Sequence, residues 1–314
     1  MAKIAIALQE ALTQRAVNGT AGFPAARLVA AGDGWLVEDV VCTSGPRDPV
    51  YEERHSHVRV AIVAAGSFQY RAECRHGTAR ELMTPGSVLL ATEGQCFECR
   101  HDHVTGDRCL SFGYTTEYFE GLTGERRARD LRVVRLPPLR DLSPLVARAC
   151  AAVEGDADVA WEELSVELGA RVVQLANTRS MNLNRMPSGA MARVTRVVRR
   201  IERQPDAALT LRSLAREADL SPYHFLRTFE QLTGVTPHQY VLRTRLREAA
   251  LRLVSGPAKV LEIALDCGFG DVSNFNRAFR AEFGVSPRAY RDHEVTKPRR
   301  KTRRNTGEQE GKSR

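Results

Sequence analysis

Residues 263–291 read IALDCGFGDVSNFNRAFRAEFGVSPRAYR, and this stretch decides the fold of the C-terminal half of the chain. Within it Phe275 and Phe279 stand four positions apart, which is the spacing of neighbours on one face of a helix. An earlier segment matches it at an offset of 50 residues. The matched pairs are Phe225/Phe275, Arg227/Arg277, Phe229/Phe279, Gly234/Gly284, Pro237/Pro287 and Tyr240/Tyr290. That many matches indicate a duplicated unit.

The first copy is predicted to be a helix-turn-helix unit. Residues 211–218 form a short helix, and Ser221 caps a second helix that opens at Pro222 and runs to about residue 232. The two phenylalanines of this second helix are expected to bury against the preceding helix. The side chains then left facing outward are Tyr223, Leu226 and Arg227.

The second copy follows the same plan. Residues 260–267 form the short helix, Gly268 ends it in a left-handed conformation, and Asp271 caps a helix that runs to residue 283. A long helix over residues 236–254 joins the two copies. The outward side chains of the second copy are Val272, Ser273, Asn276 and Arg277.

Two such units joined by one helix could lie in successive major grooves on one face of DNA, about 34 Å apart. Arginine can contact guanine through two hydrogen bonds, and asparagine can do the same with adenine. The alternative for Arg227 and Arg277 is that they only cap, or form ion pairs with, neighbouring helices. Their outward placement in both copies favours contact with DNA.

Charge is unevenly distributed over the 314 residues, whose net charge is +8. Residues 1–180 carry 20 Lys+Arg and 24 Asp+Glu, a net charge of −4, whereas residues 181–314 carry 26 and 14, a net charge of +12. A basic half suits a polyanion partner, although a solvated basic surface would show the same surplus. The hydrophobic content of 43% excludes wholesale disorder, and no apolar run is long enough to span a bilayer. We expect a cytoplasmic protein, because the N-terminal apolar run is too short for a signal peptide.

The C-terminal half resembles the AraC/XylS family of bacterial transcription regulators. The resemblance covers about residues 190–291 and is carried by Ile263-Ala264, Gly268-Phe269, the Phe-x-Arg-x-Phe segment and the closing Phe283-Gly284-Val285-Ser286-Pro287. It implies a domain of seven helices with two recognition helices. The residues it implies in DNA binding are Ser221, Tyr223, His224, Leu226, Arg227, Val272, Ser273, Asn276 and Arg277.

The resemblance also implies a function and its partners. We expect a sequence-specific regulator that binds double-stranded promoter DNA, acts with RNA polymerase, responds to a small-molecule effector or a metal, and forms a homodimer. We expect no catalytic activity and no membrane partner. The alternatives are a cupin-type metalloenzyme or a DNA-repair methyl acceptor fused to a helix-turn-helix module, and a non-specific DNA binder driven by charge.

The N-terminal half is predicted to be a small antiparallel β-barrel or sandwich. Short alternating strands, broken by turns at Gly66 and Pro85-Gly86, fill residues 55–115. This region resembles the family's cupin-type sensor barrel, so the fold class is α+β multidomain, with a cupin-like antiparallel β-barrel followed by an all-α double helix-turn-helix domain. The expected ranges are 1–140 for the sensor, 141–180 for a helical segment, 181–296 for the DNA-binding domain and 297–314 for a basic disordered tail.

Two amphipathic helices are predicted in the helical segment. Apolar residues recur at helical spacing over residues 145–153 and 160–177. These helices could cover the sheet of the N-terminal half, or they could pair with a second subunit.

A metal site is one reading of the histidines and cysteines in the first half. In metal-dependent cupins a His-x-His pair such as His55 and His57 is followed by a glutamate, but Ala61 and Ile62 stand here, which puts iron-type oxygenase chemistry in doubt. A second group suits zinc or another soft metal. Its members are Cys96, Cys99, His101, His103 and Cys109.

The same group has two other readings: a thiol pair poised for oxidation, or buried cysteines beside surface histidines. Strand alternation places Cys96 on the opposite face from Cys99, His101 and His103 unless a turn intervenes. The chain has seven cysteines and no secretory signal, so a disulfide framework is not expected.

Overall fold

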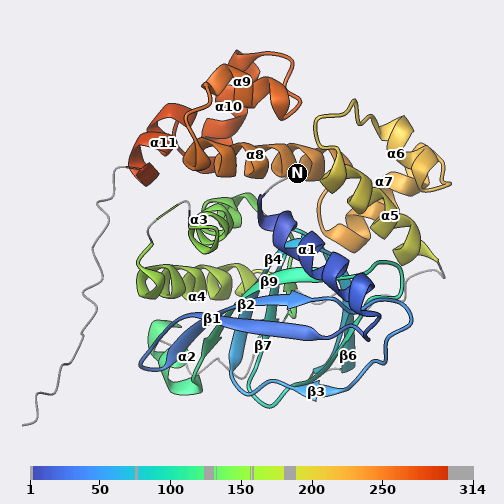
Figure 1. The fold of residues 1–314 in the computed structure, drawn as a ribbon, viewed down its shortest axis with the longest axis vertical. Helices are drawn as coiled ribbons and strands as arrows, with labels where there is room; N and C mark the ends of the chain where they lie inside the picture. Colours follow the sequence, from blue (N-terminus) through green and yellow to red (C-terminus); the bar gives the residue numbers. More distant parts are fainter. Residues whose placement is uncertain are drawn as a thin grey trace, which may run out of the picture.

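The structure of the chain is a computed structural model that describes residues 3–74, 77–123, 131, 133–155, 157, 159–179 and 189–295. The expected α+β arrangement is confirmed, because antiparallel sheets fill the N-terminal half and helices fill the C-terminal half (Figure 1). The predicted tail, 297–314, lies outside the described residues.

The strands form two antiparallel sheets. The six-stranded sheet has the order β1-β2-β9-β4-β7-β10, and the four-stranded sheet has the order β3-β8-β5-β6. The strands are β1 (Pro24–Gly32), β2 (Trp35–Cys42), β3 (Glu53–Arg54), β4 (Val58–Gly66), β5 (Phe68–Cys74), β6 (Gly77–Met83), β7 (Val88–Ala91), β8 (Cys96–Arg100), β9 (Asp107–Tyr114) and β10 (Arg135–Leu136).

The two sheets pack face to face over a shared apolar core. Val63 and Cys109 of the larger sheet meet Phe68, Tyr70 and Met83 of the smaller one, and all five side chains are buried. The strands predicted in residues 55–115 are therefore confirmed, and the alternation of their apolar side chains puts one face of each strand into this core.

The N-terminal hairpin of β1 and β2 was not anticipated from the sequence. Its turn is Asp33-Gly34, with Gly34 at a φ of +81°, between the paired residues Gly32 and Trp35. An Asp-Gly pair between two apolar runs is a strong hairpin signal, because a tight two-residue turn requires a positive φ. The helix α1 (Lys3–Asn18), which precedes the hairpin, was also missed.

The outer face of the six-stranded sheet is covered by helices. The two predicted amphipathic helices are confirmed as α3 (Ser143–Val153) and α4 (Trp161–Asn177). Their apolar residues Leu145, Leu164, Leu168 and Val172 are buried in one core with the sheet. The sequence left two roles open for these helices, covering the sheet or pairing with a second subunit. Within the chain, they cover the sheet. The short elements α2 (Thr116–Thr123) and η1 (Arg140–Leu142) border the same layer.

The described C-terminal residues form the seven helices that the family resemblance implies. They are α5 (Ala190–Arg203), α6 (Leu211–Glu217), α7 (Pro222–Thr233), α8 (Pro237–Ser255), α9 (Val260–Asp266), α10 (Val272–Phe283) and α11 (Pro287–Val295). Helix α8 connects the two helix-turn-helix units, with α6 and α7 beside one end and α9 and α10 beside the other (Figure 1). In the part of the chain that the structure describes, no helix is long and apolar enough to cross a bilayer.

Candidate DNA interface and a buried polar cluster

Both predicted recognition helices begin with the expected cap. The Ser221 hydroxyl accepts a hydrogen bond from the backbone N–H of His224 at 3.4 Å, at the start of α7. At the start of α10, Asp271 Oδ1 accepts from the backbone N–H of Asn274 at 2.7 Å. These side chains satisfy amide groups that a helix leaves without intrahelical partners. The turn before α10 contains Gly268 at a φ of +83°, as predicted.

The phenylalanine pairs fix which face of each recognition helix points inward. Phe225 and Phe229 of α7 are fully buried with their ring centroids 5.4 Å apart, and Phe275 and Phe279 of α10 repeat this arrangement at 5.5 Å. Burying two aromatic rings strongly favours one rotation of each helix about its axis. The opposite face is therefore presented to solvent in both copies.

Most of the residues predicted to contact DNA lie on that solvent face. Leu226 and Val272 are half-buried, so they present less surface than expected. The exposed members of the predicted set are Ser221, Tyr223, His224, Arg227, Ser273, Asn276 and Arg277. The structure thus places a polar surface on each of two helices, each containing an arginine at the same position of the repeat.

The two arginines bond within their own helices. Arg227 Nη1 donates to the Tyr223 hydroxyl at 3.1 Å, and Arg277 Nη2 donates to Asn274 Oδ1 at 3.3 Å. Among the described residues, neither guanidinium forms an ion pair with a neighbouring helix. Because each group is exposed and retains further N–H donors, it can contact a base edge or a phosphate.

The N-terminal half contacts both helix-turn-helix units. Arg135 of β10 donates to the carbonyl of Thr233, at the end of α7, at 2.9 Å. The Ser143 hydroxyl at the start of α3 donates to Glu282 near the end of α10, and Arg243 of α8 pairs with the same carboxylate at 3.2 Å. The segment that follows β7 therefore touches the C-terminal ends of both recognition helices and leaves their exposed faces free.

A pocket of about 220 Å³ lies between the two halves of the chain. Apolar residues of α1, including Ile4, Leu8 and Leu12, line one side, and charged residues of α5 and α8, including Arg199 and Arg247, line the other. The loop between β8 and β9 contributes residues 104–106. The pocket is thus built by groups far apart in the sequence.

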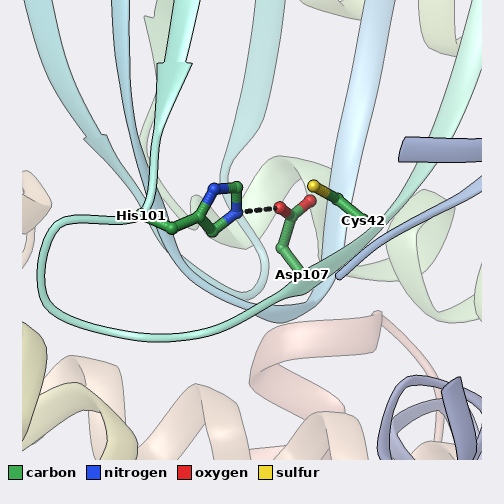
Figure 2. Close-up of side chains that lie close together, drawn as sticks. All are labelled: Cys42, His101 and Asp107. Carbon is green, nitrogen blue, oxygen red and sulfur yellow. Dashed lines mark hydrogen bonds and ion pairs between the residues drawn. The ribbon is translucent and has the colours of Figure 1, made fainter. Parts of the chain in front are cut away.

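The predicted cysteine and histidine group is only partly brought together. Cys99 and Cys109 lie near one another and near Asp107, to which His101 is hydrogen-bonded, whereas His103 is exposed on the loop after β8. Cys96 stands three positions before Cys99 on β8, an odd spacing that places it on the other face of the strand. Two residues that the sequence did not single out, Cys42 and Asp107, join His101 (Figure 2).

Burial and the Asp107 carboxylate together shift the pKa values of His101, Cys99 and Cys109. Burial alone lowers the pKa of His101, but hydrogen bonds to Asp107 and Cys42 outweigh it and raise the pKa to about 10. Burial and the Asp107 charge together hold the pKa values of the Cys99 and Cys109 thiols well above their usual range. The imidazole is therefore protonated and these two thiols are neutral at pH 7.

The predicted cupin-type pair His55 and His57 does not share a partner. The ring of His55 stacks on Phe97 at 3.9 Å between centroids, and its Nε2 lies 2.9 Å from the Tyr70 hydroxyl. His57 Nδ1 instead lies 2.9 Å from the hydroxyl of its neighbour Ser56.

Comparison with known proteins matches the C-terminal region. The family model described as "Helix-turn-helix domain" covers residues 214–293. The HTH-type transcriptional regulator MtrA of Neisseria gonorrhoeae is 31% identical over 99 residues, which is 32% of this chain and 33% of that protein. The transposon Tn10 TetD protein of Escherichia coli is 36% identical over 95 residues, which is 30% of this chain and 69% of that protein.

A solved structure is also similar in sequence to this region. The crystal structure of the DNA-binding domain of AdpA, in complex with a target DNA, is 31% identical, with a TM-score of 0.31, and the match covers 32% of this chain and 90% of that one. The chain spans about a third of the length of the first curated relatives, 33% and 36%.

Proposed function

Because the chain belongs to the AraC/XylS family of helix-turn-helix regulators, we propose that it is a sequence-specific transcription regulator whose helices α7 and α10 contact promoter DNA. The observation that carries the proposal is the repeated geometry of these two helices. Each has a capped N-terminus, a buried phenylalanine pair and an exposed arginine opposite that pair. A non-specific binder would require only the positive charge of this half and not two equivalent, oriented faces.

The exposed side chains differ between the two helices. Tyr223, His224 and Arg227 stand on α7, whereas Ser273, Asn276 and Arg277 stand on α10. Arginine suits guanine in both positions, but only α10 presents an asparagine, which suits adenine. We therefore propose that the two helices contact different base sequences in neighbouring major grooves.

Control by a small molecule is part of the proposal. The pocket between the halves is lined by α1, by the loop before β9 and by helices α5 and α8. A ligand there would contact the N-terminal half and the DNA-binding helices together. Its affinity would then depend on how the two halves are arranged, and binding would favour the arrangement with the higher affinity. Regulation of this kind needs no chemical step, and we assign the chain no catalytic role.

The remaining partners follow from the family. We propose that the protein acts in the cytoplasm as a homodimer and together with RNA polymerase. The helices α3 and α4 bury their apolar stripes inside the chain, so a dimer contact would use other surfaces.

Selection of bound duplexes from a random DNA library tests the proposal. The full chain should enrich two short conserved blocks whose centres lie about one helical turn apart, because the two recognition helices would occupy successive major grooves. Enrichment of no sequence would refute specific regulation.

A further inference from the structure

Five side chains that carry metal-binding atom types gather where the two sheets of the N-terminal half meet. Cys42 ends β2, Cys99 lies on β8, His101 follows β8, and Asp107 and Cys109 lie on β9. We call these residues the inter-sheet cluster. Only Cys99 is half-buried, and the other four side chains are buried.

Three members of the inter-sheet cluster converge closely (Figure 2). A ligand atom from each of Cys42, His101 and Asp107 lies within 4.8 Å of the other two. His101 Nε2 is 2.6 Å from Asp107 Oδ1. The Cys109 thiol donates to the other oxygen of the same carboxylate at 3.2 Å, so a fourth side chain adjoins this group of three.

The backbone holds these residues in place. Cys42 and Asp107 are direct partners in the pairing of β2 with β9, and Cys109 follows Asp107 by two positions on the same face of the strand. The loop that returns from His101 ends at Gly106, whose φ is +78°. A side chain at that position would bring its Cβ within 2.9 Å of the Cys42 carbonyl oxygen, so the loop lies directly against the end of β2.

We propose that the inter-sheet cluster is a metal site that binds zinc or a similar soft divalent ion through Cys42, His101, Asp107 and Cys109. Thiolate, imidazole and carboxylate are the ligands that zinc takes in four-coordinate sites. Ligand atoms at about 2.0–2.3 Å from a four-coordinate ion lie about 3.3–3.8 Å from one another. His101 Nε2 and Asp107 Oδ1, now 2.6 Å apart, would therefore separate by about 1 Å to admit the ion between them.

Binding is an exchange of protons for the ion. Cys42 and Cys109 each lose a thiol proton, and His101 loses the Nε2 proton that it shares with Asp107. The ion then takes the position of that hydrogen bond. The alternative to a metal site is a simple ion pair between His101 and Asp107. Such a pair would not require thiols, whereas here Cys42 and Cys109 both lie beside the Asp107 carboxylate.

The site also has a structural consequence, because it holds both ends of an exposed loop. His101 and Asp107 bracket a loop in which Asp102, His103 and Thr105 are exposed. Residues 104–106 of this loop line the pocket that faces α5 and α8. An ion held at both ends of the loop would therefore fix the surface that the N-terminal half presents to the DNA-binding helices.

Titration of the metal-free full-length protein with Co²⁺ tests the proposal. We expect one equivalent to bind per chain with thiolate-to-cobalt charge-transfer absorption, and Zn²⁺ to displace it. The substitutions Cys42→Ser and His101→Gln should each weaken binding by roughly 100-fold or more, because each removes a ligand. Cys96→Ser is the matched control, since it removes a cysteine from β8 on the opposite face, and it should bind as the wild type does.

A wild-type protein without charge-transfer absorption, or equal binding by all three variants, would overturn the proposal. If Cys42→Ser or His101→Gln fails to fold, as judged by circular dichroism, alkylation of the wild-type protein tests the metal site instead. Zn²⁺ should then protect Cys42 and Cys109 but not Cys96 from alkylation, as read by peptide mass spectrometry. Labelling of Cys42 and Cys109 that does not change when Zn²⁺ is added would equally overturn it.

Discussion

Arg247 of α8 and Glu202 of α5 form an ion pair at the junction of the two halves of the chain, with Arg247 Nη2 3.1 Å and 3.2 Å from the two carboxylate oxygens. The other terminal nitrogen of Arg247 donates to the carbonyl of Pro85, in the turn before β7, at 3.4 Å. Tyr240 and Thr244 also donate to Glu202, each at 3.1 Å. Arg247 thus bonds to both the DNA-binding domain and the turn before β7, beside the pocket proposed for the effector.

Replacing this arginine should destabilise the protein. Arg247→Met keeps most of the apolar stem but leaves the Glu202 carboxylate with neutral donors only. The expected loss in free energy of unfolding is roughly 1–3 kcal/mol, less than for a fully buried pair because the Glu202 side chain keeps 25% exposure. Urea denaturation measures it. Arg252→Met is the control, since that side chain is 37% exposed and its pair should contribute less than about 1 kcal/mol. Equal losses in the two variants would contradict the account.

Acid should destabilise the N-terminal half through His55. Burial, with a smaller effect from Arg59, lowers the pKa of His55 from 6.5 to about 4. The unfolded chain therefore takes up a proton at a higher pH than the folded chain does, and stability falls as the pH drops from 6.5 towards 4. We expect His55→Gln to lose less unfolding free energy over this window than the wild type. Chemical denaturation at a series of pH values measures the unfolding free energy of both proteins. If the two free energies fall in parallel with pH, His55 is not the cause of the acid sensitivity.

Removing residues 297–314 should weaken DNA binding without changing its sequence preference. The segment contains eight Lys+Arg and two Asp+Glu. Cations near phosphates release counterions, so the truncated chain should bind every duplex more weakly and show a shallower dependence of affinity on salt. Fluorescence anisotropy at several salt concentrations measures both quantities. If affinity and slope are unchanged, this segment has no part in binding.

Local chemistry explains why the helix-turn-helix units could be predicted from the sequence. Ser221 and Asp271 cap helices that begin at the next residue, and the phenylalanine pairs set the inward face at a spacing of four. All of these signals act within one or two helical turns. The hairpin of β1 and β2 also depends on a local signal. Its turn residues, Asp33-Gly34, could have been used to predict it.

Contacts between distant segments could not be predicted in the same way. Cys42 meets Asp107 only because β2 pairs with β9, and the sequence does not give that register. The spacing of Cys96, Cys99 and His101 pointed to this strand, but it gave no sign of Cys42 and Asp107, which the structure places beside His101. Arg247 and Glu202 likewise stand 45 residues apart and meet through the packing of α8 against α5. The N-terminal site and the junction therefore required the three-dimensional structure.

The claim that both α7 and α10 contact bases is tested most directly by repeating the DNA selection with Arg227→Ala and Arg277→Ala. Each exposed arginine should specify bases in one block only, so each variant should lose conservation in its own block and retain the other. At the wild-type site each should bind roughly 1–3 kcal/mol more weakly, which anisotropy titration measures. Equal weakening on selected and random DNA, with both blocks intact, would make the arginines phosphate contacts and contradict the account.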